Sequence, residues 1–424
     1  MQRIFLKYLT DKVKRSKTYA WVIVGLLWAV ALLNYTDRQM LSTMKDSMQA
    51  DIRELQSAEQ FGALMAIFLW IYGLMSPVSG VIADRINKKW LIVASLLVWS
   101  SVTLLMGFAD TFNQLYCLRA IMGVSEALYL PAGLALITNY HTTKTRALAV
   151  GIHMTGLYMG QALGGAGATI ASCFSWRIAF QCLGLIGIVY SFVLALFLHE
   201  KKKSLREANG RSVVLGKPPL LEGFGILFTN ISFWILLFYF SVPSLPGWAV
   251  KNWLPTMFAI NLRIDMSEAG PLSAITIAVS SFLGVIFGGM WSDKWLQRNV
   301  RGRVYTSAIG TGLTIPALLL LGFGNSFFCL IGATFFFGFG FGMFDSNNMP
   351  ILCQFVSARH RATAYGLMNM TGVFGGAFIT NWLGKSTDEG HLGRDIALLS
   401  TIVMLMLLIQ VFFLRPKEND FGNG

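Results

Sequence analysis

Long apolar stretches dominate this chain and restrict what it can fold into. Runs of roughly 20 predominantly apolar residues, the length that crosses a bilayer as a helix, recur about twelve times in the 424 residues. Only 13% of the residues are charged, against about 25% in a soluble domain. We therefore expect an all-α membrane protein with twelve transmembrane helices. The predicted spans are 20–44, 58–83, 90–108, 113–138, 147–172, 178–198, 228–258, 270–292, 304–323, 327–352, 363–383 and 396–414.

The positive charges predict how the spans are oriented. With an even number of spans and the N-terminus inside, 25 of the 34 Lys and Arg residues fall in cytoplasmic segments and six fall outside. This asymmetry is the positive-inside signal, and it places both termini in the cytoplasm. The net charge of +13 is thus explained by topology and by contact with anionic lipid, and it indicates no nucleic-acid partner. The short loops favour a bacterial inner membrane.

The chain divides into two halves around one polar stretch. Residues 200–225 form its only long polar segment and predict a cytoplasmic linker between an N-terminal six-helix bundle, 1–199, and a C-terminal one, 226–424. Matching motifs recur in the halves at offsets of 209 to 216 residues, as expected for a carrier with pseudo-symmetric halves around a midplane site. The motif pairs are Gly80-Val-Ile-Ala-Asp84-Arg85 with Gly289-Met-Trp-Ser-Asp293-Lys294, Arg146-Ala-Leu-Ala-Val-Gly151 with Arg361-Ala-Thr-Ala-Tyr-Gly366, and Met154-Thr155-Gly156 with Met370-Thr371-Gly372.

Charged residues inside two spans are the main candidates for a site. Asp37 and Arg38 lie in the first span, and Arg119 and Glu126 lie seven residues apart on one face of the fourth. Charges at such depth are costly and usually line an ion or substrate path. A guanidinium binds a carboxylate through paired donors, so Arg38 and Arg119 are candidate ligands of an anionic substrate.

Asp37 and Glu126 are the candidate proton carriers. Burial favours a neutral carboxyl group, whereas a nearby arginine favours the charged one, so small movements could change their protonation. We expect protonation of Glu126 to free Arg119 from an internal ion pair and so to couple proton entry to anion entry. The alternative is that Asp37, Arg38, Arg119 and Glu126 form a fixed network holding the first and fourth spans together.

Weaker candidates surround this cluster. Tyr35, Asn34 and Gln161 could donate hydrogen bonds to substrate hydroxyls or only to neighbouring helices. In the second half, Asn348 belongs to a polar patch of the tenth span, and Lys251 either caps the cavity or snorkels to the surface. No cysteine or histidine spacing predicts a metal site, so we expect neither metal nor cofactor.

Several of these motifs resemble one known family. Gly80 to Lys89 resembles the loop motif of the major facilitator superfamily, and the twelve spans extend the resemblance over nearly the whole chain. Further motifs resemble its anion:cation symporter family, which includes proton-coupled carriers of sugar acids: Asn34-Tyr35-Thr36-Asp37-Arg38, Arg119-x-x-x-Gly123-x-x-Glu126-Ala127, Trp176-Arg177 and Trp253-Leu254-Pro255-Thr256. The resemblance implies that the arginines of the first and fourth spans bind substrate and that the neighbouring acids carry protons. Spinster-type lipid carriers have a similar pattern in these two spans.

The motifs at the cytoplasmic ends predict a gate. Gly80 should permit close helix approach, Asp84 with Arg85 and Arg146 should form a latch, and Asp293 with Arg361 should repeat it. These latches should hold the outward-facing state and break as the bundles rock. Pro243, Pro246 and Gly247 are expected to interrupt the seventh span, which should gate the outer side.

The sequence therefore predicts a transporter and excludes several other classes. It has no H-E-x-x-H, G-x-S-x-G or P-loop motif that would indicate an enzyme, and no ATP-binding domain, so an ion gradient must drive transport. We expect a monomer that carries an organic anion such as a hexuronate with protons, with sodium left open as the coupling ion. The alternatives are a Spinster-like carrier of lipid or another amphiphile, and a transporter of neutral sugar.

Overall fold

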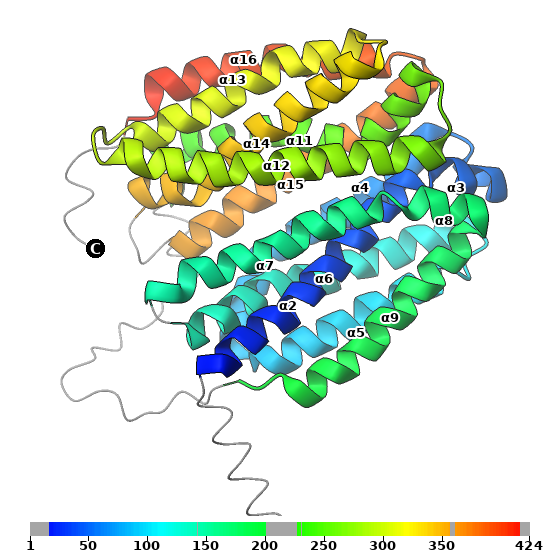
Figure 1. Ribbon diagram of the computed structural model, residues 1–424, viewed down its shortest axis with the longest axis horizontal. Helices are drawn as coiled ribbons and strands as arrows, with labels where there is room; N and C mark the ends of the chain where they lie inside the picture. Colours follow the sequence, from blue (N-terminus) through cyan, green and yellow to red (C-terminus); the bar gives the residue numbers. More distant parts are fainter. Residues whose placement is uncertain (1–16, 142, 201–226, 230, 357–360, 416–424) are drawn as a thin grey trace, which may run out of the picture.

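The computed structural model describes residues 17–141, 143–200, 227–229, 231–356 and 361–415, and this part of the chain is helical without strands. Two bundles of six long helices lie against each other, the N-terminal one from blue to green and the C-terminal one from green to red (Figure 1). The first bundle contains α2 (Lys17–Thr43), α4 (Ala58–Arg85), α5 (Lys88–Met106), α6 (Phe112–Tyr140), α7 (Thr143–Gly164) and α9 (Trp176–Phe197). The second contains α11 (Ile231–Leu262), α12 (Met266–Leu296), α13 (Gly302–Phe323), α14 (Phe327–Phe355), α15 (Arg361–Asp388) and α16 (Leu392–Phe413).

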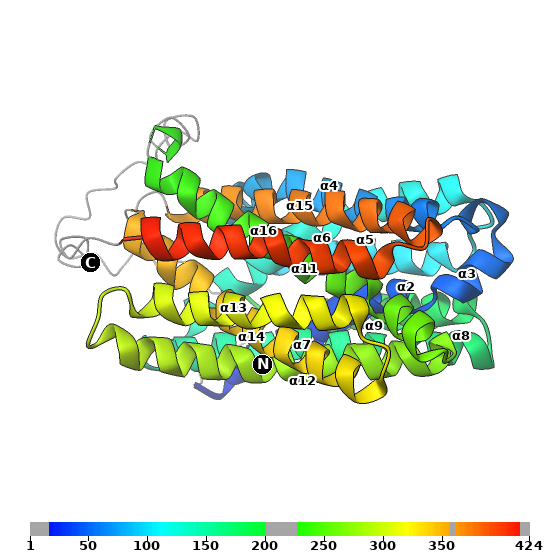
Figure 2. The same cartoon turned by 90° about the horizontal axis from the view of Figure 1, so that it is seen from above.

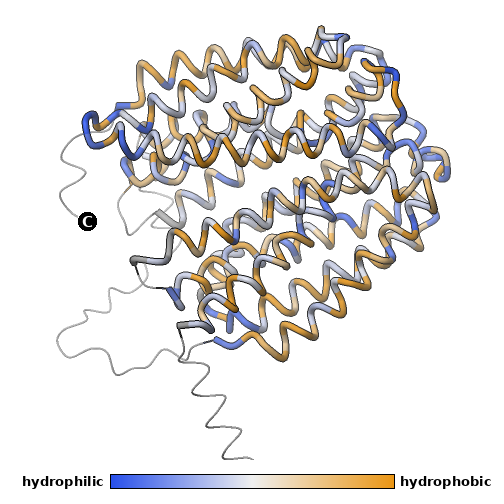
Figure 3. The backbone as a smooth tube through the Cα atoms, in the orientation of Figure 1, coloured by the Kyte–Doolittle hydropathy of each residue, from blue (hydrophilic) through white to orange (hydrophobic). Residues whose placement is uncertain are grey.

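The helices define two ends of the molecule. α2 begins and α16 ends at one end, called here the terminal end (Figures 1 and 2). The opposite, distal end holds the short helices α3 (Lys45–Asp51), η1 (Arg53–Leu55) and α8 (Gly167–Cys173). Apolar residues cover the middle of the long helices, and polar residues gather at both ends (Figure 3). This banding is the pattern of a protein that spans a membrane several times.

The twelve long helices of the described residues lie at the twelve predicted spans, which confirms the fold class. Ten of them are long and apolar enough to cross a membrane by composition alone. The other two, α7 and α15, are richer in glycine and polar residues, and each packs against the opposite bundle, α7 on α12 and α15 on α4. Because these helices face protein as well as lipid, their hydropathy is lower. The predicted linker 200–225 lies, apart from Glu200, outside the described residues.

Two details of the predicted spans are wrong. The fifth span is not continuous over 147–172, because α7 ends at Gly164 and α8 begins at Gly167. The seventh is not interrupted, because α11 continues through Pro243, Pro246 and Pro255. A proline leaves the carbonyl four residues earlier without its helical partner. For Pro255 this is the carbonyl of Lys251, which accepts a hydrogen bond from Gln39 Nε2 of α2 at 3.3 Å.

Glycines spaced by four residues bring α7 close to α2. A methyl group on Gly156 would lie 2.6 Å from the carbonyl oxygen of Trp28, and one on Gly164 would lie 2.8 Å from that of Thr36. The contact at Gly160 between them is tighter still, because a methyl group there would lie even closer to the carbonyl oxygen of Leu32. Such a small-residue stripe allows backbones to approach within a membrane, where dispersion and not the hydrophobic effect holds helices together.

The bundles are in contact at the distal end. The carboxylate of Asp388, the last residue of α15, accepts hydrogen bonds from Ser57 Oγ (2.7 Å) and from the backbone nitrogens of Ala58 (2.8 Å) and Glu59 (2.9 Å) at the start of α4. On the other side of the bundles, a methyl group on Gly165 would lie 2.7 Å from Ala274 Cβ of α12. Both seams between the bundles, α4–α15 and α7–α12, are therefore closed here.

The terminal end is more open. A methyl group on Gly80 or on Gly289, the matching glycines of α4 and α12, would meet nothing within 4 Å. Asp345 lies ten residues, or ~15 Å, from the terminal end of α14, yet its side chain is exposed. The two bundles thus touch at the distal end and leave Asp345 exposed well inside the terminal end. A carrier whose bundles rock against each other has this form in one of its conformers.

Candidate functional site

Four charged side chains from α2 and α6 lie inside the N-terminal bundle. Asp37 and Arg38 come from α2, and Arg119 and Glu126 come from α6. The exposed fractions of Asp37, Arg119 and Glu126 are 2%, 3% and 1%. These side chains point away from lipid, as the cost of charge in a bilayer requires, so the residues grouped in the sequence analysis share one interior.

Arg38 and Glu126 form the central ion pair. Arg38 Nε lies 2.6 Å from Glu126 Oε2, a charge-assisted hydrogen bond between two helices. The guanidinium carbon of Arg38 also lies 5.2, 4.8 and 4.6 Å from the ring centres of Tyr35, Phe68 and Tyr72. These three rings form an aromatic collar that stabilises the cation through its faces and fixes the direction of its donors.

Arg119 is more completely buried than Arg38. No carboxylate in the described part of the chain lies within ion-pair distance of it. The guanidinium carbon of Arg119 is 4.6 Å from the ring centre of Phe68, and its Nη1 donates to Met122 Sδ at 3.2 Å. Its Nε has no acceptor among the residues that the structure describes. The prediction of an ion pair between Arg119 and Glu126 is therefore wrong. Seven residues along one helix separate them by ~10 Å, so Glu126 is reached instead by Arg38 of the neighbouring helix.

Asp37 faces a different neighbour from Arg38. Its Oδ2 accepts a hydrogen bond from Thr103 Oγ1 of α5, and its Oδ1 has no partner among the described residues. Adjacent residues of a helix point about 100° apart, so Asp37 turns into the bundle while Arg38 turns toward the other half. Thr103 was missed because a threonine in an apolar helix carries no signal until its neighbour is known.

A small cavity of about 30 Å³ lies where the two halves meet. Gln161 from α7 borders it, and the Nε2 of this residue has no partner in the described segments. Lys251 from α11 enters from the C-terminal half, and its Nζ lies 5.3 Å from the ring centre of Trp248 and 5.7 Å from that of Tyr35. This volume holds about two waters, so a sugar-sized solute needs the walls to separate. The lining residues are Tyr35, Arg38, Gln39, Gln161, Trp248, Lys251 and Asn252.

The structure thus brings four of the candidate binding residues to one cavity and leaves three away from its lining. Arg119 packs its guanidinium on the ring of Phe68 and does not line the cavity. Asn34 is buried, and its Nδ2 has no partner in the described part of the chain. Asn348 belongs to a hydrogen-bonded group of the C-terminal bundle, where its Nδ2 donates to Asp345 Oδ1 at 3.3 Å and its Oδ1 accepts from Tyr239 at 3.1 Å.

Gln39 was missed by the sequence analysis and has two partners. Its Nε2 donates to Ser42 Oγ at 3.0 Å and, across the bundles, to the Lys251 carbonyl that Pro255 leaves free. The signal for it was present but indirect, since a proline four residues after a lysine predicts a carbonyl in need of a donor. Gln39 therefore connects the cavity wall of one half to that of the other.

The predicted gate is visible only in part. Gly80 makes no close approach, because the bundles are apart at the terminal end, and Arg85 is exposed. Asp293 pairs with Arg303 of α13 at 3.0 Å, an arginine ten residues along that the sequence analysis did not single out. The side chains of the other predicted latch residues lie outside the described part of the structure: Asp84, Arg146 and Arg361.

Comparison with known families and proteins matches this architecture. The profile of the Major Facilitator Superfamily matches residues 27–380. A solved bacterial homologue of the human lysosomal transporter Spinster, described as inward-facing and unoccupied, superimposes with a TM-score of 0.81 at 18% identity and covers 96% of this chain and 99% of its own. At that identity the likeness concerns the fold alone.

Curated bacterial transporters are also similar over nearly their whole length. The chain is 26% identical to a probable L-galactonate transporter of Escherichia coli over 97% of this chain and 92% of that protein. It is 24% identical to the hexuronate transporter of Bacillus subtilis over 84% and 90%. It is 26% identical to a probable galactarate/D-glucarate transporter of Escherichia coli over 78% and 81%.

Proposed function

The chain belongs to the Major Facilitator Superfamily and is a multi-pass membrane transporter, not an enzyme; we propose that its solute is a sugar acid, such as a hexuronate or an aldonate, carried together with a proton. The observation that carries the proposal is the single ion pair between Arg38 and Glu126 at the edge of a cavity shared by both halves. The relatives named above are hexuronate, galactonate and galactarate/glucarate transporters, and all of those solutes carry a carboxylate.

The cavity offers the donors that such a solute requires. Arg38 from the N-terminal half and Lys251 from the C-terminal half place two cations on opposite walls, and the guanidinium can hold a carboxylate through two donors. Gln161, Asn252 and Tyr35 add neutral donors and acceptors for sugar hydroxyls. Asn252 Nδ2 already donates to Thr380 Oγ1 at 2.8 Å, but Gln161 Nε2 has no partner among the described residues. An apolar solute would leave this amide without one, at a cost of about 1–3 kcal/mol.

Competition for Arg38 supplies the coupling. While Glu126 is ionised, it occupies the Nε donor of Arg38. A proton on Glu126 removes the negative charge that opposes an incoming carboxylate, so protonation favours anion binding, and by linkage anion binding favours protonation. Arg119 packs on the ring of Phe68, as Arg38 does. When the aromatic collar opens, Arg119 serves as the second arginine that binds the anionic solute. Asp37, bonded to Thr103, is the second proton carrier.

The orientation follows from the charges. We place the terminal end in the cytoplasm of a bacterial inner membrane, because most Lys and Arg residues belong to the segments at that end. The protein then acts as a monomer that is open to the cytoplasm in this structure. No cofactor takes part, and the proton gradient supplies the energy.

Uptake by reconstituted vesicles tests the proposal. Purified protein in liposomes should accumulate a labelled hexuronate or aldonate when the outside is more acidic, and a sodium gradient alone should not replace the proton gradient. Glu126→Gln should keep exchange of the solute but lose accumulation and its pH dependence. Glu59→Gln, which changes an exposed carboxylate at the distal end, is the matched control and should behave as the wild type.

Three outcomes would contradict the proposal. Stabilisation of the protein by lysolipids but by no sugar acid would favour an amphiphile carrier. Equal uptake of glucose and glucuronate would favour neutral sugar. Proton-driven accumulation that persists in Glu126→Gln would remove this carboxylate from the coupling.

A further inference from the structure

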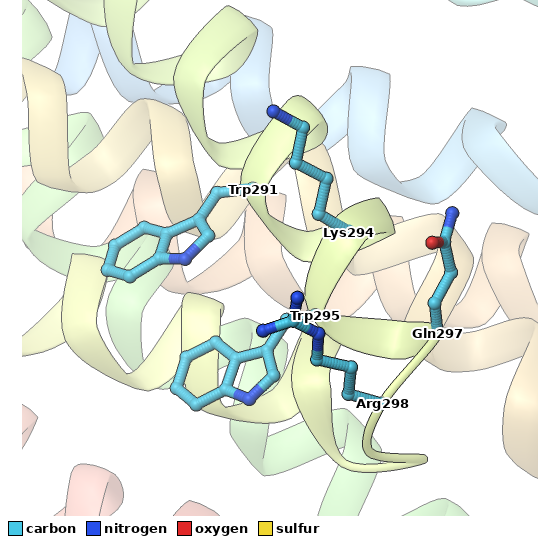
Figure 4. A pocket seen from close by; sticks show the side chains of 5 residues that line it. All are labelled: Trp291, Lys294, Trp295, Gln297 and Arg298. Atoms are coloured by element: carbon cyan, nitrogen blue, oxygen red, sulfur yellow. The ribbon is translucent and has the colours of Figure 1, made fainter.

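A second and larger pocket lies far from the transport site, at the terminal end of α12. Its volume is about 590 Å³, within the range of small-molecule sites. Two tryptophans and two cations surround it (Figure 4). The lining residues are Trp291, Lys294, Trp295, Gln297 and Arg298.

Stacked rings make one wall of this pocket. Trp291 and Trp295 lie 5.7 Å apart between ring centres with planes 17° from parallel, and Trp295 lies 5.6 Å from Tyr305 of α13. Arg301 covers the outer ring of the stack, with its guanidinium carbon 4.8 Å from the centre of Tyr305. Tryptophan and tyrosine collect where hydrocarbon meets headgroups, so this wall marks the depth of the membrane interface.

The cations of the pocket have no anionic partner among the residues that the structure describes. Lys294 and Arg298 are exposed, and neither forms an ion pair with a described residue. The nearby carboxylate of Asp293 is held by Arg303 at 3.0 Å, and Arg301 donates to the carbonyl of Val411. Beside its aromatic wall, the pocket therefore has two positive charges that no described carboxylate neutralises.

An apolar stripe continues from the pocket along the helix. Leu283, Ile286, Phe287 and Met290 are spaced i, i+3, i+4 and i+7 on α12, the spacing of one helical face, and are 43%, 44%, 46% and 61% exposed. Phe287 lies 5.2 Å from Trp291 between ring centres, so the stripe joins the aromatic wall. Lys294 follows one turn after Met290.

The repeat of the two halves shows that this pocket is particular to one of them. At the offset of 209 residues that relates the loop motifs, the positions of Trp291 and Trp295 are occupied by Ile82 and Ile86. The aromatic wall is thus absent from the corresponding end of α4, although Arg85 and Lys89 match the two cations. Carrier symmetry does not require these tryptophans.

We propose that this pocket binds the headgroup of an anionic phospholipid, with the phosphate between Lys294 and Arg298 and one acyl chain along the stripe of α12. A cation beside apolar surface at the interface matches the two parts of such a molecule, and each basic residue near an anionic headgroup contributes about 1 kcal/mol. A soluble phosphate would use the cations but would leave the stripe and the rings without a contact.

Lipid binding to the purified protein tests this assignment. Native mass spectrometry of the intact chain, with phosphatidylglycerol or phosphatidylcholine added at equal concentration, should show preferential retention of the anionic lipid. The double variant K294Q/R298Q should weaken that retention by about tenfold or more. The matched control R53Q/K385Q removes one arginine and one lysine from the distal end, where both are exposed, and should retain the lipid as the wild type does.

Further experiments distinguish binding of a lipid from binding of a free anion. Glycerol phosphate and inorganic phosphate should not displace phosphatidylglycerol, and Trp291→Ala should weaken lipid retention while leaving thermal stability without lipid nearly unchanged. Displacement by glycerol phosphate would assign the pocket to a soluble anion and overturn the proposal. Equal retention of phosphatidylglycerol by wild type, K294Q/R298Q and control would overturn it as well.

Discussion

The two halves share a scaffold but differ in their charges. Equivalent helix pairs pack in both, α2 on α7 and α11 on α15, or α4 on α6 and α12 on α14. The N-terminal half buries two acids and two arginines on α2 and α6, whereas the facing part of the C-terminal half is rich in phenylalanine and carries Lys251 and Asp345. Symmetry thus serves the rocking motion, which needs two similar bodies, while the buried ion pair belongs to the N-terminal half and the other half adds Lys251 to the cavity.

The largest effect should follow from breaking the ion pair of the charged half. Arg38→Ala leaves Glu126 buried without its partner, which should lower stability by about 3–5 kcal/mol and abolish uptake. Thermal unfolding and vesicle uptake measure the two effects. The double variant Arg38→Ala/Glu126→Gln should regain most of the stability and none of the transport. If the double variant also transports, Arg38 is a structural residue.

The C-terminal half should contribute less. Lys251→Gln removes the one lysine that borders the cavity and should raise the apparent KM about tenfold, since a charge-assisted hydrogen bond is worth roughly 1.5–3 kcal/mol. The pH dependence of uptake should remain. Loss of pH dependence in this variant would mean that both halves take part in proton coupling.

A neutral contact should matter still less. Gln161→Leu removes an amide whose Nε2 has no partner among the described residues and should weaken the affinity for a hexuronate about threefold, the value of one neutral hydrogen bond. Titration of the wild type and variant with a hexuronate, followed by thermal shift, measures this change. An unchanged affinity would place the sugar hydroxyls elsewhere.

The smallest effect concerns the distal contact between the halves. Partial burial raises the pKa of Asp388, but the hydrogen bonds from Ser57, Glu59 and Ala58 outweigh it and hold the pKa below its usual value. Because the pKa of Asp388 is lower in the folded protein than in the unfolded chain, the carboxylate stabilises the contact at pH values above the pKa of the unfolded chain. This stabilisation is lost as the pH falls through the pKa of the folded protein.

Asp388→Asn should therefore cost at most about 1 kcal/mol at neutral pH, the value of an anion at a helix N-terminus, and nothing in acid. Thermal unfolding across the acid range measures the difference. Glu54→Gln, which changes an exposed carboxylate at the distal end, is the control. A loss that is constant with pH would contradict the assigned role of the carboxylate.

The sequence predicted the helices, and the grouping of four charged residues on α2 and α6, better than it predicted which of these residues contact each other. Twelve apolar runs and the position of charges within them are properties of local sequence, and so are the faces of a helix. Partner choice is not local. Glu126 pairs with Arg38 because α2 and α6 pack together, and Asp293 of α12 meets Arg303 of α13 across the loop between these helices, which no periodicity reveals. The continuity of α11 through Pro255 likewise depends on Gln39, a donor from the other half.

The glycines of the α4–α15 seam have a practical consequence. A methyl group on Gly384 would lie 2.5 Å from the carbonyl oxygen of Ala58, and one on Gly62 would lie 3.0 Å from that of Thr380. Backbone atoms cannot yield to a larger side chain as flexible groups do, so Gly384→Leu excludes the present conformer. Such a variant gives a preparation enriched in the opposite state, suited to raising state-specific antibody fragments and to screening inhibitors that enter from the other side.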